Sequence, residues 1–353
     1  MAARLRQQVR GGSWPHLSRL PPDADLARHL GVGTNTVRRA LTLLHTEGLV
    51  ERRRGSGTVV LGQPSSIEQT GPRVGVLVPS LTRYFPPLVR GVRDVVEAGG
   101  GTVVARPSDH GAAQESAVLD DFCSSGLEAM VVVPLTPSLA TPQFRDRLES
   151  LEVPVVVAER LPPVSGAERG DSRLSCVVSD VRRGGLMAVH HLVRAGRSRI
   201  GLLSSRDTAT SEDFHSGFTQ AAHDLGVAVG QATLRWRYDW RRPQQIRRTV
   251  RGYVSTLVQT GTDAVVCFDS TVVSALLREL EAAGCRVPDD VAVITYDEEG
   301  GHPTPIPVTA VVPDRGEVGR LAAHVLLRQL DRGIQIPVTQ TLVSPDLVLG
   351  AST

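Results

Sequence analysis

The chain has 353 residues, a formal net charge of +2 at pH 7 and four cysteines. It shows no signal peptide and no apolar run of 18 residues, which excludes a membrane-spanning protein and predicts a cytoplasmic one. The cysteines are scattered without CxxC spacing, so we expect reduced thiols at Cys123, Cys176, Cys267 and Cys285.

The near-neutral total hides an uneven distribution of charge. Residues 1–62 hold ten arginines and four acidic residues, whereas the rest of the chain holds 29 arginines and 33 acidic residues. A basic head on an acidic body is the electrostatic pattern expected of a nucleic-acid-binding module at one end of a larger protein.

Local patterns in residues 20–60 predict two short helices followed by a hairpin. A first helix over about residues 23–29 has one apolar side and is interrupted by a Gly-Val-Gly sequence. Thr34 or Asn35 can cap a second helix, and two strands, 49–53 and 58–61, then flank a glycine-containing turn. Two helices joined by a short glycine turn are typical of the helix-turn-helix motif, whose second helix enters the DNA major groove.

These segments, LPPDADLARHLGVGTNTVRRAL and EGLVERRRGSGTVV, resemble the winged helix-turn-helix domain of GntR-type bacterial transcription regulators. The resemblance covers residues 1–61, and the chain starts inside that family's first helix, so we expect this helix to be short or clipped. Ala24 and Thr34 stand where the family often has arginine, which leaves the preferred base sequence open.

The second helix and the wing carry the expected DNA contacts. They are Asn35, Thr36, Arg38, Arg39, Arg52, Arg53 and Gly55. We expect Arg38 to contact base edges and the wing arginines to anchor phosphates. The alternative is a solvated helix face and a charge run that contact no DNA.

The rest of the chain alternates between apolar strands and amphipathic helices. Residues 63–72, QPSSIEQTGP, are expected to form a linker, and the following residues, about 280, suffice for two lobes. The pattern predicts parallel sheets covered on both faces. Strands are expected at 73–79, 102–105, 129–133, 153–158, 199–203, 263–267 and 291–295. Helices are expected at 86–98, 114–124, 143–151, 184–195, 212–225, 243–260 and 270–283.

This body resembles the effector-binding domain of LacI/GalR-type regulators, which is similar to periplasmic sugar-binding proteins. The matching runs include RVGVLVPSLTRYF, VPVVVAERLP, SDVRRGGLMAVHHLVRAGRSRIGLL, RVPDDVAVITYDE and PDLVLGAST. The predicted fold is therefore an N-terminal winged helix-turn-helix (α+β) followed by a two-lobed, periplasmic-binding-protein-like α/β body with two doubly wound parallel sheets. The resemblance implies one lobe from 73–180 and about 309–333, and a second from 181–308 and 334–353.

The resemblance also implies an effector-binding cleft at the carboxyl ends of the strands. Glu159 and Asp297 stand at strand ends where the family has carboxylates that bind the ligand. Trp240 lies near a position that stacks on ligand in relatives, and Tyr84 and Phe85 follow the first strand. The alternatives are loop capping for the acids and simple packing for the aromatics.

Two departures from the family change the expected ligand. Phe214 stands where relatives usually have an arginine, three residues before the Gly217-Phe218 pair, and Phe268 replaces an asparagine. Phenyl rings in place of polar groups favour a less polar effector than an ordinary hexose, or no effector at all.

Other kinds of chemistry find no support in the sequence. There is no GxxxxGK[ST] phosphate loop and no GxSxG nucleophile motif, so we expect no enzymatic activity and no cofactor. His190 and His191 are adjacent, and neighbouring helical residues point in different directions, so we expect no metal site there.

The combined expectation is a homodimeric transcription regulator that binds double-stranded operator DNA and a small-molecule effector, a sugar or a less polar metabolite. A repressor is favoured, whose cleft closes on a small molecule and changes the spacing of two DNA-binding heads on a palindromic operator. The alternatives are an activator, a small-molecule-binding protein without DNA function, and an enzyme built on the two-lobed body.

Overall fold

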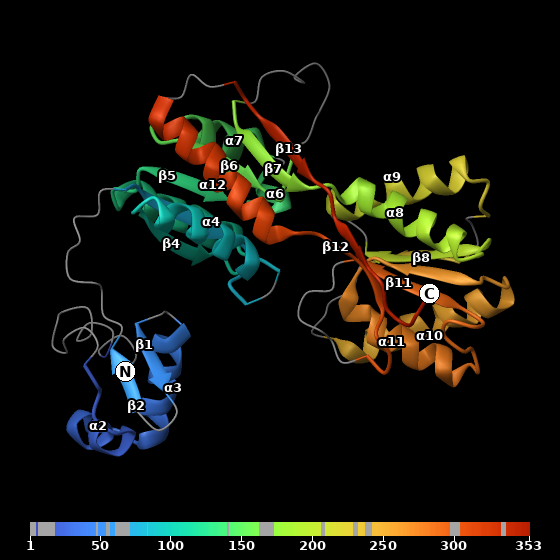
Figure 1. Ribbon diagram of the computed structural model, residues 1–353, viewed down its shortest axis with the longest axis horizontal. Coiled ribbons are helices and arrows are strands. Elements are labelled where there is room, and N and C mark those ends of the chain that lie inside the picture. Colours follow the sequence, from blue (N-terminus) through green and yellow to red (C-terminus); the bar gives the residue numbers. More distant parts are fainter. Residues whose placement is uncertain are drawn as a thin grey trace. The chain divides into compact units, whose positions relative to one another are not determined.

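The computed structural model in Figure 1 contains two compact units, Met1–Thr70 and Gly71–Thr353. The residues that the structure describes are 5, 18–46, 49–53, 57–60, 71–82, 84–139, 141–161, 173–205, 209–228, 232–236, 242–296, 304–332 and 337–353.

The N-terminal unit has the expected order of helix, helix and hairpin. Helix α2 (Asp23–Leu30) ends at Gly31, whose φ of 70° places it in the left-handed region that a glycine adopts without strain. Helix α3 (Thr34–Thr46) follows, and its apolar side joins that of α2 in one buried cluster. Strands β1 (Val50–Arg53) and β2 (Gly57–Val60) then pair antiparallel. This arrangement confirms the predicted winged helix-turn-helix.

The first lobe of the larger unit is a parallel sheet with strand order β13-β7-β6-β5-β3-β4. Its strands are β3 (Arg73–Val78), β4 (Thr102–Pro107), β5 (Ala129–Val132), β6 (Val155–Ala158), β7 (Ser175–Ser179) and β13 (Gln340–Val343). Helices α4 (Pro86–Ala98) and α12 (Arg315–Arg332) lie side by side on one face. Helices α5 (Ala112–Ser124) and α7 (Pro142–Glu149) cover the other, and α6 (Thr136–Leu139) precedes α7. The central strands are buried on both faces, which explains their uninterrupted apolar sequences.

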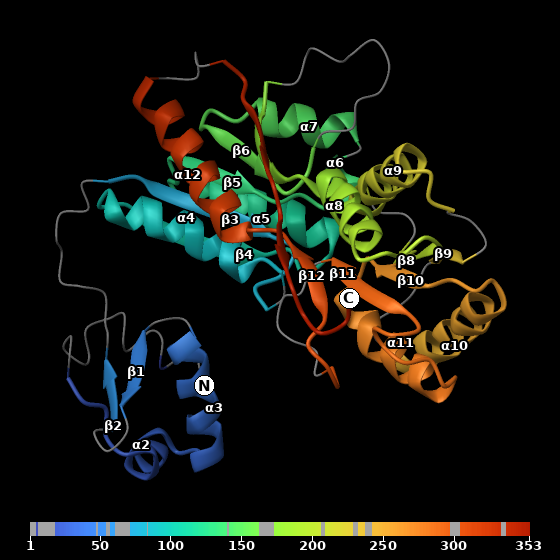
Figure 2. The same cartoon turned by 45° about the vertical axis from the view of Figure 1, so that its right-hand side comes forward.

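The second lobe repeats this plan with strand order β14-β12-β11-β10-β8-β9. Its strands are β8 (Ile200–Ser205), β9 (Thr233–Trp236), β10 (Ala264–Cys267), β11 (Ala292–Tyr296), β12 (Thr309–Val312) and β14 (Asp346–Val348), of which only β14 is antiparallel among the described strands of this sheet. Helices α8 (Val181–Arg194) and α9 (Ala209–Asp224) pack on one face, and α10 (Pro243–Gln259) and α11 (Ser270–Ala282) on the other (Figure 2). The two doubly wound sheets confirm the predicted fold class.

The chain passes between the lobes three times, and two of these crossings lie elsewhere than expected. Strand β12 pairs with β11, so residues 309–312 belong to the second lobe and only α12 returns to the first. Strand β13 pairs with β7, which places residues 340–343 in the first lobe and leaves β14 to the second. The expected lobe boundaries near 309 and 334 are therefore corrected, because the pairing of β12 with β11 and of β13 with β7 decides which lobe each segment joins.

Two pairs of helices approach each other through glycines. A Cβ atom added to Gly217 of α9 would lie 1.9 Å from the carbonyl oxygen of Arg182 in α8, and one added to Gly185 of α8 would lie 2.3 Å from the carbonyl oxygen of Phe214. Helices α4 and α12 also approach through glycines, since a Cβ atom added to Gly91 or to Gly319 would lie 2.1 Å from a carbonyl oxygen of the other helix. All these contacts would be far shorter than a van der Waals separation, so the spacing of α8 and α9 requires glycine at positions 185 and 217.

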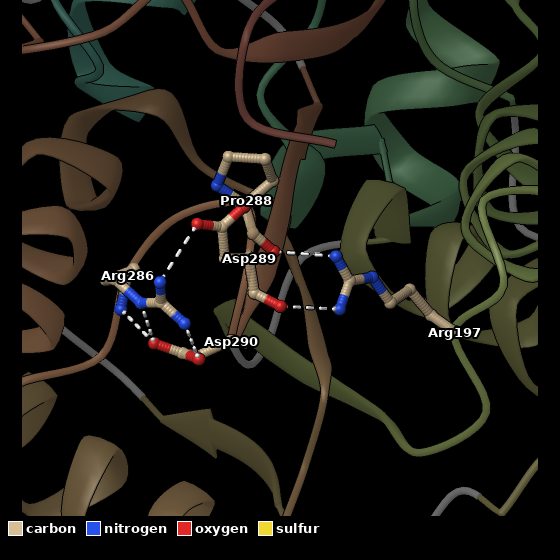
Figure 3. A network of polar contacts seen from close by, with 5 residues as sticks. All are labelled: Arg197, Arg286, Pro288, Asp289 and Asp290. Atoms are coloured by element: carbon tan, nitrogen blue, oxygen red, sulfur yellow. Dashed lines mark hydrogen bonds and ion pairs between the residues drawn. The ribbon is translucent and has the colours of Figure 1, made fainter.

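A network of polar contacts fixes the loop that leads into β11 (Figure 3). The Nε and Nη2 atoms of Arg286 donate to the two carboxylate oxygens of Asp290, at 3.0 and 2.9 Å. These hydrogen bonds lower the pKa of Asp290 to about 2. Arg197, which follows α8, donates to the carbonyl oxygens of Pro288 and Asp289 in the same turn, at 2.6 and 3.3 Å. Arg286 thus neutralises the carboxylate of the turn, and Arg197 provides hydrogen-bond donors for two of its carbonyl groups.

Candidate functional site

The exposed face of α3 carries four of the predicted DNA contacts. Asn35, Thr36, Arg38 and Arg39 are exposed, whereas Val37 between them is buried in the head's core. This is the division that a 3.6-residue period imposes on an amphipathic helix. The four side chains are thus available together on one surface.

Arg38 is held toward the amino end of the neighbouring helix. Its Nε donates to the Asp23 carboxylate at 3.2 Å, while 61% of the Arg38 side chain stays exposed. An exposed pair of this kind orients a long side chain but contributes little stability. Of the predicted wing contacts, Arg52 and Arg53 lie on β1 with side chains outside the described part, and Gly55 lies outside the described residues.

The larger unit has a cavity of about 340 Å³ where its two lobes meet. Residues of both lobes line it: Glu159, Arg160, Leu161, Val178, Ser179, Asp180, Val181, Arg182, Arg183, Leu186, Thr210, Asp213 and Leu342. They come from the carboxyl ends of β6 and β7, from strand β13 and from the first turns of α8 and α9. The carboxyl ends of parallel strands and the amino ends of the following helices are where α/β folds bind small ligands.

Glu159 contributes a carboxylate to this cavity, as predicted from its position after β6. Its Oε1 accepts a hydrogen bond of 2.8 Å from the Ser179 hydroxyl, and Oε2 accepts one of 3.4 Å from the Ser179 amide. Only 7% of its side chain is exposed, and Nε of Arg315 lies 4.0 Å from Oε1. The carboxylate is therefore fixed in position by the adjacent strand β7.

Arg160, the next residue, was not among the predicted contacts. Its Nη1 donates to the Glu159 carbonyl oxygen at 2.6 Å, while Nε is enclosed and has no hydrogen-bond partner among the residues that the structure describes. Burial lowers the pKa of Arg160, and the charge of Arg315 adds to this effect while that of Glu159 opposes it. Arg315 itself lies over the Tyr84 ring, 5.5 Å from its centroid.

Backbone strain gathers at the same edge of the first sheet. The non-glycine residues with positive φ in the described part of the chain are Tyr84, Asp109, His110 and Glu159, with φ between 48° and 61°. They follow β3, β4 and β6 at the carboxyl edge of the first sheet, and Glu159 among them lines the cavity. Unfavourable backbone conformations persist where surrounding contacts impose them, and they concentrate at binding sites.

The second lobe contributes Asp213 and Thr210 from α9. Burial raises the pKa of Asp213, and the charges of Asp180 and Glu212 raise it further, against the opposing effect of Arg182. Asp180 caps α8 by accepting a 2.9 Å hydrogen bond from the Arg183 amide. Sequence reasoning missed these residues, although an aspartate directly before an amphipathic helix is a recognisable N-cap signal.

Two of the aromatic residues predicted at the effector site, Phe85 and Phe214, are buried in the cores, whereas Tyr84 and Phe268 are partly buried. Phe214 is fully buried, and its ring centroid lies 4.9 Å from that of Phe268 and 5.1 Å from that of Tyr296. Phe85 is buried against the first sheet. Phe214 thus faces the core of the second lobe, whereas Asp213, its neighbour on α9, lines the cavity. A contact of Phe214 or Phe268 with an effector stays a prediction.

Two further predicted contacts, Trp240 and Asp297, lie outside the described residues. Within the part that the structure describes, no group of His, Cys, Asp or Glu is arranged to hold a metal ion. Nor does any helix in that part have the length and apolar character needed to cross a membrane.

Two family models match separate parts of the chain. Residues 1–60 match the bacterial regulatory proteins of the gntR family, and residues 189–353 match the periplasmic binding protein-like domain. The arabinose metabolism transcriptional repressor of Geobacillus stearothermophilus is 24% identical over 345 residues, covering 95% of this chain and 91% of the relative.

Solved structures show the same body. The transcription regulator CcpA of Lactococcus lactis aligns with a TM-score of 0.64 at 19% identity, over 80% of this chain and 99% of that one. A LacI family transcriptional regulator from Enterococcus faecium, solved with bound ribose, aligns with a TM-score of 0.61 at 19% identity, over 80% and 98%. At these identities the likeness establishes the fold of the body.

Proposed function

Because the chain is a transcription regulator that joins a GntR-type DNA-binding domain to a LacI-like, periplasmic-binding-protein-like domain, we propose that it represses genes under the control of a small molecule. The observation that carries this proposal is the cavity lined by residues of both lobes. A ligand that contacts both lobes binds one lobe arrangement better than another, and only such a difference can change operator affinity.

In this proposal the exposed face of α3 binds the operator. Arg38 contacts base edges from its position beside Asp23, and Asn35, Thr36 and Arg39 extend the same surface. Arg52, Arg53 and Gly55 of the wing bind phosphates. The support is the clustering of these exposed residues on the second helix of the motif, which is the helix that enters the major groove.

We further propose that the protein acts as a homodimer in the cytoplasm and catalyses no reaction. A two-fold dimer matches a palindromic operator whose half-sites are about 10 base pairs, or a multiple of this, apart. The named repressors among the relatives support regulation rather than catalysis.

The test is binding of the purified full-length chain to the intergenic DNA beside its own gene, measured by fluorescence anisotropy with a scrambled duplex as control. We expect preferential binding of the intergenic DNA, and a change in that affinity with a cavity ligand. Equal binding of both duplexes would contradict the proposal and favour a small-molecule-binding protein without DNA function. Reporter output in a deletion strain then separates repression from activation.

A further inference from the structure

The lining of the cavity between the lobes includes arginines from both lobes. Three arginines line it, Arg160, Arg182 and Arg183, and a fourth, Arg315, lies beside the Glu159 carboxylate. Arg182 and Arg183 lie in the first turn of α8, whose amino end carries the positive end of the helix dipole. The guanidinium of Arg182 donates to the Gln220 side chain at 3.0 Å, so the cavity combines Arg160 and Arg183 with a helix terminus that favours negative charge.

Among these arginines, Arg160 has an enclosed side-chain nitrogen without a hydrogen-bond partner in the described part of the chain. Its one hydrogen bond given by the described residues is to a neutral carbonyl oxygen, and its enclosed Nε has no partner there. The carboxylate of the preceding residue, Glu159, already accepts hydrogen bonds from the hydroxyl and amide of Ser179. A guanidinium with an enclosed nitrogen that lacks a partner is costly, and an oxyanion is the group that removes this cost.

Three acidic residues, Glu159, Asp180 and Asp213, line the cavity as well, and Arg315 lies beside Glu159 as a fourth arginine. Asp180 is occupied at the α8 N-cap, where its carboxylate accepts from the Arg183 amide. Asp213 lies in surroundings that favour its neutral form, since burial and the neighbouring acids raise its pKa. The hydroxyl of Thr210, at the start of α9, is a further neutral donor on the cavity wall.

We propose that the effector of this regulator carries an anionic oxygen group, a carboxylate or a phosphate ester, that binds Arg160 beside the amino end of α8. This inference rests on the proposed function for the identity of the cavity as the effector site. The cavity volume of about 340 Å³ limits the ligand to a small metabolite. The remaining polar groups of the ligand then lie against Glu159, Thr210 and Asp213.

The proposal is tested with matched neutral and anionic probes on the full-length chain. The probes are D-ribose, D-ribonate and D-ribose 5-phosphate, with inorganic phosphate as the smallest anion, and the readouts are melting temperature and calorimetric Kd. We expect at least one of the anions to raise the melting temperature and D-ribose to have a smaller effect or none. Comparison of ribonate with the phosphate compounds distinguishes a carboxylate from a phosphate ligand.

Two substitutions are expected to change the affinity for the anion in opposite directions. Arg160→Gln should weaken anion binding on the order of tenfold to a hundredfold, the range for loss of a charged hydrogen bond. Glu159→Gln keeps the acceptor for Ser179 but removes a negative charge beside the anion, so it should tighten anion binding several-fold. Arg93, exposed on α4 and outside the cavity lining, provides the matched control: Arg93→Gln should leave the Kd unchanged.

Inorganic phosphate stabilises many proteins without a specific site, so only the shift lost in Arg160→Gln counts as binding at the cavity. A D-ribose effect equal to that of the anions, an absence of any anion effect, or weaker anion binding in Glu159→Gln would each overturn the proposal. The opposite response of Glu159→Gln cannot arise from misfolding of Arg160→Gln. Failure of the proposed function has a separate signature, which is equal affinity for intergenic and scrambled DNA.

Discussion

Gly217→Ala should destabilise the second lobe, even though alanine is the better helix former. The new methyl group would lie 1.9 Å from the carbonyl oxygen of Arg182, and a normal contact is about 3.5 Å. Helices α8 and α9 would therefore have to separate by roughly 1.5 Å or distort. Overpacking of this kind costs about 1–3 kcal/mol, and the helix-propensity gain of alanine offsets about 1 kcal/mol of the cost.

The assay compares melting temperatures and denaturant midpoints of Gly217→Ala with those of Gly252→Ala. Gly252 is a helical glycine of α10, and a Cβ added there meets no heavy atom of the described residues within 4 Å. The control substitution should therefore gain stability from propensity alone, by about 0.5–1 kcal/mol. We expect the Gly217→Ala variant to melt several degrees lower than the control, at about 2–4 °C for each kcal/mol.

Equal or higher stability of Gly217→Ala relative to Gly252→Ala would refute the reasoning, because it would mean that α8 and α9 can separate at no cost. The cavity supplies an independent readout. Thr210 and Asp213 of α9 line it together with Arg182 and Arg183 of α8, so a changed helix spacing should also weaken ligand binding.

Three further substitutions test separate parts of the protein. Arg38→Ala should weaken operator binding by about 1–3 kcal/mol in duplex titrations and leave the affinity for random DNA nearly unchanged. Equal losses on both duplexes would exclude base recognition. Arg53→Ala should weaken all duplexes and reduce the slope of log K against log salt by about one; an unchanged slope would exclude a phosphate contact. Asp290→Asn should lower the melting temperature at neutral pH, because the native pKa of about 2 lies below the unfolded value of 3.8. The carboxylate's contribution is present above pH 4 and lost as pH falls toward 2, so the variant and the parent should converge there; a constant difference would contradict the role of the Arg286 pair.

The sequence was sufficient for most of the sheet strands because a parallel sheet buries them on both faces. Strands β3, β5, β10 and β11 are uninterrupted apolar runs, and the structure contains each within two residues of its expected bounds. Strand β9 was missed because its sequence, TLRW, lies at the edge of a sheet and has no such run. Strands β12 and β13 divide differently between the lobes because nothing in their sequences specifies which parallel neighbour they pair with.

The site was less predictable, because a helix changes direction by about 100° with each residue. Phe214 and Asp213 are neighbours in sequence, yet one is in the core and the other on the cavity wall. Resemblance to a family identifies the position, but the phase of α9 decides which of the two residues lines the cavity. Arg160 was missed for a different reason, since an arginine after a strand-end glutamate is most often a surface residue.

The position of the cavity at a chain crossing connects ligand binding with lobe arrangement under the proposed function. Ser179, the last residue of β7 in the first lobe, donates to Glu159, and two residues later Val181 begins α8 of the second lobe. A ligand held by Arg160 on one side and by the first turn of α8 on the other therefore spans the shortest covalent link between the lobes. A contact on both sides of a link restrains the angle across it more effectively than one farther away, and even a small rotation at a hinge is amplified along a rigid lobe. The same argument explains why the cavity needs fixed walls: the Ser179 hydrogen bonds and the glycine contact of α8 with α9 set the wall positions before a ligand arrives, so that binding energy is available to select one lobe arrangement.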